Sequence, residues 1–249
     1  MRILSATVAL LASLLFVAEP ASAQVLWEGD PAKGTRVFGN LECARPGSIV
    51  TARQDEGFVA WRYTKKKAEA GQKSVVRCET RGIRTDAGRF RFRNNSTYYL
   101  GWSSKLSTTT AGDYTIFQWK SYCDNGAPGN GAQNYPVIMK IKEGHARLFF
   151  VGVGETWNLI WTGQVEPWKW YRFVVGIHTS NKLRGGWVEF YFNGEQQRLG
   201  KDGVLRYPGR TLDTYNEPKW GIYDRQRPEL EAVHRIYRMK VGTTYNDVR

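Results

Sequence analysis

The sequence predicts an all-β fold, and three observations lead to this prediction. Apolar and polar residues alternate with a period of two through much of the chain, aromatic residues make up 14% of it, and turn-forming residues separate short alternating runs. Many short strands without intervening helices are typical of a two-sheet sandwich or jelly roll. With no linker or internal repeat, residues 24–249 are expected to form a single β-jelly-roll domain.

The strand pattern is clearest in eight runs, and a helix is expected only over residues 63–70. The eight runs are residues 89–93, 114–122, 135–142, 146–151, 170–178, 187–193, 219–225 and 235–241. Asn193-Gly194 is a two-residue hairpin signal between strands. Residues 124–131 concentrate Asn, Gly and Pro, which predicts a loop.

Residues 1–23 have the organisation of a signal peptide. Arg2 gives a positive start, residues 3–17 are apolar, and small residues end the segment at Ala23. The apolar run is short for a bilayer span and lacks a basic flank, so a membrane anchor is disfavoured. We therefore expect a secreted, extracellular, monomeric protein that begins at Gln24.

The mature chain is strongly basic. The formal net charge is +13, and removal of residues 1–23 leaves it unchanged because Arg2 and Glu19 are lost together. A field of one sign concentrates ligands of the other sign. Outside the cell an acidic polysaccharide is the expected polyanion, rather than nucleic acid, although the charge alone is equally explained by solubility.

Three cysteines remain in the mature chain, and none lies in a CxxC motif. They are Cys43, Cys78 and Cys123. In an oxidising compartment one disulfide and one buried thiol are expected, and the spacing leaves the pairing open.

Alternation separates an apolar face from a polar face in each run. In residues 114–122, Phe117 and Trp119 lie opposite Gln118, and in residues 219–225, Trp220 lies opposite Tyr223. The polar faces of four runs together hold Arg89, Arg91, Arg93, Gln118, Lys120, Tyr122, Arg172, His178, Lys219, Tyr223 and Arg225. Cations, amides and phenols dominate this set and carboxylates are scarce, which predicts a groove for an anionic chain.

These residue types suit the cleavage of a uronate polymer by β-elimination. The sugar carboxylate must be neutralised so that charge can develop at C5, a base must remove the C5 proton, and an acid must protonate the leaving O4. Gln118, Lys120 and Lys219 suit the first task, and Tyr223 and His178 suit the proton transfers. Taken singly, Gln118 is more typical of an ordinary surface amide, Tyr223 could simply pack with its hydroxyl in water, and His178 is by default a surface residue at a strand end.

Two short motifs resemble those of a known family. The run YTIFQWKSY at residues 114–122 and the run KWGIY at residues 219–223 resemble the fungal glucuronan lyases of polysaccharide lyase family 20. More distantly, they are similar to the heparin lyase I and alginate lyase jelly rolls. Residues 98–103, 170–178 and 186–194 extend the resemblance over nearly all of the mature chain.

The resemblance implies a concanavalin-like jelly roll and assigns roles to residues. Gln118 would help neutralise the substrate carboxylate, and Tyr223 would act as base, acid or both. Lys219 would be the basic partner of the Lys-xxx-Tyr pattern, and His178 would correspond to a catalytic histidine on a central strand. Arg77 or Arg91 would also meet the carboxylate.

The remaining implications concern substrate contacts and a metal. Lys120, Tyr122 and Arg225 are expected to bind substrate, although Asp224 stands where the family continues with arginine, which puts one such contact in doubt. Family members often carry calcium. Glu28, Asp30 and Asp213 could supply oxygen ligands, although a role in turns is equally expected. The elimination chemistry itself requires no cofactor, so any calcium would be structural.

Three functions are compatible with the sequence. The favoured one is an endolytic lyase that acts on β-1,4-glucuronan, with alginate or a heparin-type polymer as alternative substrates. The second is a jelly-roll module that binds acidic glycans without cleaving them. The third is a glycoside hydrolase, which needs two facing carboxylates, and the predicted strands offer Glu189 but no second acid on a matching face. The sequence leaves open which uronan is cleaved and how Tyr223 and His178 divide the proton transfers.

Overall fold

The computed structural model describes residues 23–43, 45, 47–70, 76–122 and 133–249. Residues 1–22 of the predicted signal peptide, the predicted loop at 124–131 and Cys123 lie outside the described residues. Among the described residues, no helix has the length and apolar character needed to cross a bilayer.

Almost all of the regular structure is β. The strands are β1 Val25–Glu28, β2 Phe38–Cys43, β3 Ile49–Arg53, β4 Val59–Lys65, β5 Arg77–Thr85, β6 Gly88–Arg89, β7 Thr97–Leu106, β8 Asp113–Tyr122, β9 Val137–Lys142, β10 His145–Gly152, β11 Thr156–Gln164, β12 Trp170–His178, β13 Gly186–Phe192, β14 Glu195–Gln196, β15 Tyr207–Gly209, β16 Tyr215–Tyr223 and β17 Ala232–Gly242. Two short helices, η1 Pro31–Val37 and α1 Tyr245–Val248, complete the described elements.

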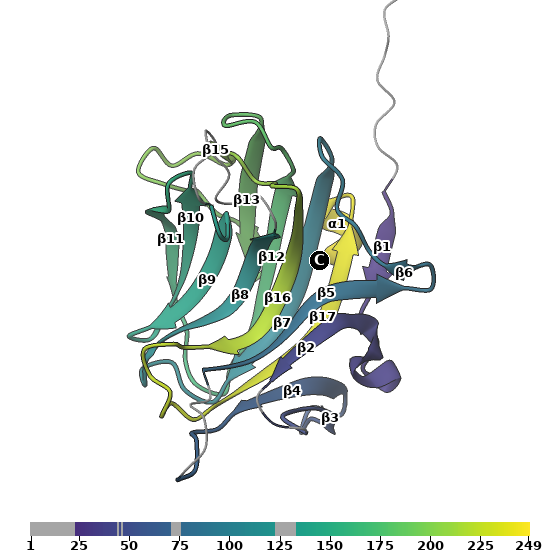
Figure 1. Cartoon of the computed structure of the whole chain (residues 1–249), viewed down its shortest axis with the longest axis vertical. Helices are drawn as coiled ribbons and strands as arrows, with labels where there is room; N and C mark the ends of the chain where they lie inside the picture. The colour runs from purple at the N-terminus through teal and green to yellow at the C-terminus, as the bar shows by residue number, and fades with distance from the viewer. Residues whose placement is uncertain (1–22, 44, 46, 71–75, 123–132) are drawn as a thin grey trace, which may run out of the picture.

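The strands form two antiparallel sheets that pack face to face (Figure 1). The nine-stranded sheet has the order β14-β13-β12-β7-β17-β4-β3, with β1 paired to β17 and β15 paired to β13. The eight-stranded sheet has the order β11-β10-β9-β8-β16-β5-β2, with β6 paired to β5. The predicted all-β sandwich is therefore confirmed.

Large aromatic side chains from both sheets fill the space between them. Trp102 from the nine-stranded sheet stacks on Phe117 with ring centroids 4.7 Å apart and meets Trp220 at 6.2 Å. Phe117, Trp119 and Trp220 come from β8 and β16 and are almost fully buried. Removal of these rings from water is the main stabilising contribution to such a core. The predicted inward positions of Phe117, Trp119 and Trp220 are confirmed.

The hairpin predicted at Asn193-Gly194 joins β13 to β14. Both residues have positive φ, 50° and 92°, and Phe192 pairs with Glu195 across the turn. Positive φ at both central residues is the requirement of the two-residue hairpin turn that Asn-Gly favours.

Two local predictions are wrong. Residues 63–70 do not form a helix, because Trp61, Tyr63 and Lys65 are buried on alternate positions of β4, which pairs with β17. Residues 89–93 form a strand only at their start, in β6. The alternation there has another cause, since Phe92 packs edge-on against Trp119 at 4.7 Å outside any ladder.

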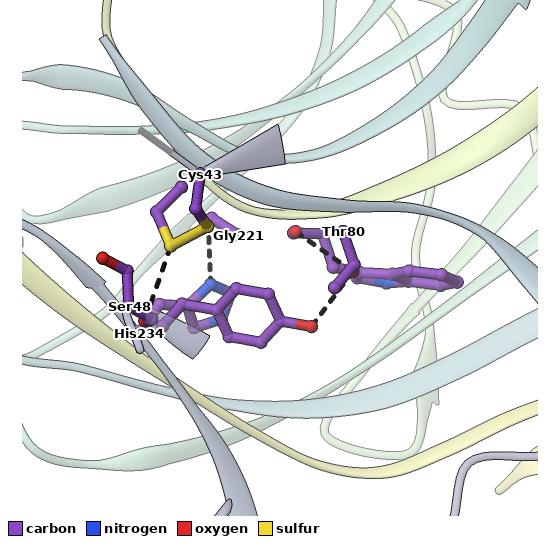
Figure 2. The surroundings of a disulfide bond; sticks show 8 residues. Cys43, Ser48, Thr80, Gly221 and His234 are labelled. Carbon is purple, nitrogen blue, oxygen red and sulfur yellow. Dashed lines mark hydrogen bonds between the residues drawn. A yellow bond between two sulfur atoms is a disulfide. The ribbon is translucent and has the colours of Figure 1, made fainter. Parts of the chain in front are cut away.

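A disulfide joins β2 to β5. Cys43 and Cys78 lie directly opposite each other in the two strands and form the bond. Figure 2 shows that it lies close to Gly221 of β16 and His234 of β17, so it belongs to the part of the sandwich that carries the late motif. The prediction of one disulfide is confirmed, and the structure supplies the pairing that the spacing left open.

Candidate functional site

The polar side chains of the two sequence motifs meet on the outer face of the eight-stranded sheet. Strand β16 lies between β8 and β5 (Figure 1), and Lys219 is the direct neighbour of Gln118 on one side and of Arg81 on the other. Four residues further along β16, Tyr223 lies opposite Arg77. The core residues of these strands point to the opposite side, so the prediction that Gln118, Lys219 and Tyr223 share one face is confirmed.

A buried carboxylate connects Gln118 to Lys219. Glu79 of β5 accepts a hydrogen bond from Gln118 Nε2 at 2.6 Å and another from Lys219 Nζ at 2.9 Å. Lys219 Nζ also donates to Glu42 of β2 at 2.7 Å. The side chains of Lys219 and Glu79 are 4% and 2% exposed, so this ion pair is shielded from water and its geometry is well defined.

Gly221 allows the close approach of the strand that carries this carboxylate. It lies opposite Glu79 in the ladder and has a φ of 147°, which favours glycine. A Cβ atom at this position would overlap the carbonyl oxygen of Cys78 and lie 2.6 Å from the Cα of Glu79. The close approach of β5 and β16 beneath the site therefore depends on glycine at position 221.

The two acids that share Lys219 respond differently to their surroundings. Burial raises the pKa of Glu79, although the charge of Lys219 opposes the shift. Burial acts in the same direction on Glu42, but hydrogen bonds and charge from Lys219 and Arg77 outweigh it and lower the pKa of Glu42. Lys219 thus binds two carboxylates, Glu42 and Glu79. Because Glu79 also accepts from Gln118, the contact between Lys219 and Glu79 holds the carboxylate that orients the Gln118 amide.

Tyr223 lies beside a cation and a small pocket. The guanidinium of Arg77 lies 4.7 Å from the centroid of the Tyr223 ring, and its Nη1 contacts Glu42 Oε2 at 3.0 Å. Tyr223 lines a pocket of about 190 Å³ together with Thr115, Tyr135, Ile138, Lys140, Trp157, Asp113, Asp224, Arg225 and Gln226. The phenol is therefore accessible to a ligand, and Arg225 is placed at the same pocket.

The opposite end of the motif strands carries stacked tyrosines and arginines. Tyr122 of β8 and Tyr215 of β16 stack with centroids 5.1 Å apart. The guanidinium of Arg81 lies 5.2 Å from the Tyr122 ring, and that of Arg91 lies 4.7 Å from the Tyr215 ring. Aromatic faces and guanidinium groups are suited to the sugar rings and carboxylates of an acidic glycan.

Lys120 is a cation between these two regions. Its ammonium donates to Asn134 Oδ1 and to the carbonyl of Ser121 at 2.7 Å, and it lies 5.0 Å from the Tyr122 ring. Burial, assisted by the charge of Lys219, lowers the pKa of Lys120 to about 8. Its charge therefore changes close to neutral pH, unlike that of an exposed lysine.

His178 does not belong to this face, so the expectation that it would meet Gln118 and Tyr223 is wrong. It lies on β12 of the nine-stranded sheet, on the side away from the core, where it contacts Thr97 Oγ1 at 3.0 Å and stacks on Trp187. Alternation correctly placed His178 opposite the buried Ile177. A period of two shows which side of its own strand a residue occupies, but not which of the two sheets the strand joins.

The expectation of a face poor in carboxylates is also wrong. Besides Glu42 and Glu79, it holds Glu217, whose 1% exposed side chain is bound by Arg89 Nε at 2.5 Å and lies 3.3 Å from Arg81 Nε. Glu217 was not predicted because the predicted strand began at residue 219, whereas β16 begins at Tyr215. A signal for Glu79 was available, since charged residues alternate with Cys78 and Thr80 from residue 77 to residue 81.

The three acids considered as calcium ligands, Glu28, Asp30 and Asp213, do not form a cluster with one another. Among the described residues, no group of three or more His, Cys, Asp or Glu side chains could hold a metal ion. Glu28 lies 3.4 Å from Lys240, Asp30 caps η1 through Ala32 N, and Asp213 accepts from Thr214 N. Each of these acids makes a local contact, and calcium binding stays a prediction.

Comparisons with known proteins bear on the family and the fold. Residues 39–246 match the family model described as polysaccharide lyase. The endo-β-1,4-glucuronan lyase of the fungus Trichoderma reesei is similar in structure, with a TM-score of 0.64 and 15% identity, over 86% of this chain and 94% of that one.

Alginate lyases are also similar in structure. The family 14 alginate lyase of Aplysia kurodai matches with a TM-score of 0.58 and 11% identity, over 89% of this chain and 100% of that one. The family 7 alginate lyase AlgAT5 matches with a TM-score of 0.52 and 12% identity, over 80% of this chain and 84% of that one. No curated protein matches the chain in sequence. At these identities the structural likeness shows the fold alone.

Proposed function

Because the chain belongs to the polysaccharide lyase family, we propose that it cleaves β-1,4-glucuronan within the polymer by β-elimination and leaves unsaturated uronate ends. The similar Trichoderma reesei enzyme is an endo-β-1,4-glucuronan lyase, and the other similar structures are alginate lyases, which supports a uronan as the substrate. The single observation that carries the proposal is the placement of Tyr223 beside Arg77, on the same face as the fixed amide of Gln118.

Arg77 and Gln118 are proposed to neutralise the carboxylate of the reacting sugar. One amide hydrogen of Gln118 is used by Glu79, and the second is left to donate to a substrate oxygen. Arg77 donates from Nη1 to Glu42, and its guanidinium group has further N–H donors that could bind the substrate carboxylate. Donors held in place before the reaction stabilise the charge that develops when the C5 proton leaves.

Tyr223 is proposed to carry both proton transfers. As a phenolate it removes the C5 proton, and as a phenol it returns a proton to O4 while the C4–O4 bond breaks and a double bond forms between C4 and C5. Since His178 lies on the other sheet, we assign neither transfer to it. A family 7 alginate lyase has been crystallised with substrate after a histidine and a tyrosine were replaced, which is compatible with a tyrosine at the reacting bond.

The remaining predicted contacts are proposed to bind neighbouring sugars of the same chain. Arg225 lines the pocket of Tyr223, whereas Arg91 and Tyr122 lie at the opposite end of the motif strands, with Lys120 between them. Lys219 is proposed to act indirectly, because its ammonium is held by Glu42 and Glu79. We also propose that the protein is secreted, which the disulfide supports because such bonds persist in oxidising compartments.

The test is to incubate residues 24–249 with glucuronan, alginate and heparan separately and to follow the ultraviolet absorbance of unsaturated uronate ends. The proposal expects the fastest release with glucuronan. Tyr223→Phe should abolish turnover and keep polymer binding, whereas the control His178→Ala should retain both. Binding to uronans without any unsaturated product would contradict the proposal, and near-normal turnover by Tyr223→Phe would remove Tyr223 from the mechanism.

A further inference from the structure

A second pocket lined by cations lies on the other side of the sandwich. It has a volume of about 350 Å³ and is lined by Arg45, Gly47, Ser48, Arg62, Thr64, Lys66, Trp168, Val233 and Arg235. None of these lining residues is an acid. Its size falls within the range of ligand sites.

The pocket is separate from the candidate active site. Arg62 and Thr64 alternate with the buried Trp61 and Tyr63 of β4, so they point away from the core. Strand β4 and its neighbour β17 belong to the nine-stranded sheet, whereas Gln118 lies on the eight-stranded one. A ligand in this pocket would therefore be bound on the face opposite to Tyr223.

Two arginines face each other in this pocket. Arg62 and Arg235 are direct cross-strand neighbours in β4 and β17, an arrangement that is unfavourable for like charges. Arg235 Nη1 donates to Gln54 Oε1 at 3.0 Å, which is a neutral acceptor. Within the described part of the chain neither guanidinium forms an ion pair. An anion that bridges the two arginines would relieve their repulsion.

Trp168 presents an aromatic face next to these arginines. The residue is 51% exposed, and its ring lies 5.2 Å from the guanidinium of Arg235. The residue has a φ of 61°, and its amide donates to the carbonyl of Leu106 at 2.7 Å. A bulky residue in this left-handed region is an outlier, and such backbone strain is found where a side chain must be presented in one position.

We propose that this pocket is a second, non-catalytic site that binds a carboxylated segment of an acidic polysaccharide. The sugar face would pack on Trp168, and Arg62 and Arg235 would bind the carboxylate, for which their planar donor forks are suited. The preference for a carboxylated sugar is inferred from the pocket itself, and the identification of that sugar as glucuronate rests on the proposed function. The site would hold the polymer on the enzyme while another part of the same chain is cleaved.

Binding is tested with a glucuronate dimer, which is too short for cleavage within a chain, and with cellobiose, its neutral counterpart. The readout is the indole N–H resonance of Trp168 in an NMR spectrum, assigned with the variant Trp168→Phe. The dimer should shift this resonance and cellobiose should not. Arg62→Glu should weaken binding of the dimer by about tenfold or more, because hydrogen bonds to charged groups contribute more than neutral ones.

The matched control is Arg184→Glu, which makes the same charge change at an exposed position between β12 and β13 and should leave binding unchanged. Arg62→Glu should also raise the KM for long glucuronan while the rate on short oligomers stays at the wild-type value. If Arg62→Glu does not fold, Thr64→Glu places an acid in the same pocket. An unshifted Trp168 resonance, or an equal response to cellobiose, would overturn the proposal.

The outcomes separate this site from the proposed function. A shifted Trp168 resonance without unsaturated product from any uronan would leave the second site in place and refute glucuronan cleavage. Normal glucuronan cleavage without a Trp168 response would refute the second site alone.

Discussion

His234 donates a hydrogen bond from Nδ1 to the carbonyl oxygen of Gly221 at 2.8 Å, and this bond joins the two sheets beneath the candidate active site (Figure 2). Its Nε2 lies 2.8 Å from Ser104 Oγ. Burial lowers the pKa of His234 to about 4, so the ring is neutral at pH 7 and its Nε2 accepts from the serine. A neutral histidine is thus part of the support of β16, the strand that carries Lys219 and Tyr223.

The first prediction concerns stability in acid. An unfolded histidine binds a proton below about pH 6.5, whereas folded His234 does so only below about pH 4. Between these values the unfolded state binds more protons, so the free energy of unfolding should fall as the pH is lowered, by about 3 kcal/mol from this residue. Denaturant unfolding at pH 7 and pH 4.5 measures most of this loss, about 2.4 kcal/mol. His234→Asn keeps a donor near Nδ1 and should reduce the difference between the two pH values, and an unchanged difference would contradict the prediction.

The second prediction concerns Gly221. Gly221→Ala should lower the free energy of unfolding by about 2–4 kcal/mol, because the added Cβ meets the backbone of β5 at a position with positive φ. Gly154→Ala is the control, since Gly154 also has positive φ but no neighbour within 4 Å of the added atom. The control should lose only about 1 kcal/mol. Equal losses in thermal or denaturant unfolding would show that close approach of the strands is unimportant.

The third prediction concerns Glu79. Glu79→Gln keeps one acceptor but removes the charge that holds Lys219 and Gln118, so turnover of glucuronan should fall by about 100-fold through misplacement of the amide. The assay is the initial rate of unsaturated end formation. Glu56→Gln, which changes an acid paired to Lys105 on the other sheet, should leave that rate unchanged. A wild-type rate in Glu79→Gln would exclude a role for this carboxylate in positioning Gln118.

The sequence predicted the inner and outer faces of the strands well, because a period of two is imposed by strand geometry wherever one side is buried. Gln118 and Tyr223 were assigned correctly for this reason. The sequence could not show which sheet His178 belongs to, because the sheet that a strand joins depends on its pairing with segments far away in the chain. Glu79 was missed because β5 was not recognised as a strand. The strand predicted over residues 89–93 was wrong because Phe92 is buried against Trp119 without pairing in a sheet.

The fourth prediction uses the titration of Lys120. Its pKa of about 8 means that its positive charge is lost as the pH rises through that value. Binding of an acidic polymer should therefore weaken between about pH 7 and pH 9, seen as a rise in KM. Lys120→Arg keeps its charge throughout this range and should show a flatter KM profile. Identical profiles for the wild type and the variant would assign the change to another group.

The fifth prediction concerns the disulfide between Cys43 and Cys78. The bond closes a loop with a sequence separation of 35 residues. Chain entropy for a loop of this size predicts a loss of about 4 kcal/mol in the free energy of unfolding when both cysteines are replaced by alanine. Urea unfolding of the double variant tests this, with the wild type under reducing conditions as a second comparison. A loss below about 1 kcal/mol would contradict the entropic account.

The internal pairing of Lys219 with Glu42 and Glu79 has a consequence for ionic strength. Mobile ions screen charges that face solvent over a distance of about 10 Å in 0.1 M salt, but they act weakly on a buried ion pair. The cations proposed to bind the polymer at the ends of the motif strands, such as the 57% exposed Arg91, should be screened by salt, whereas the buried ion pair of Lys219 with Glu79 should be screened much less. If the proposed contacts are right, salt should therefore weaken binding of the polymer more than it lowers the rate of bond cleavage.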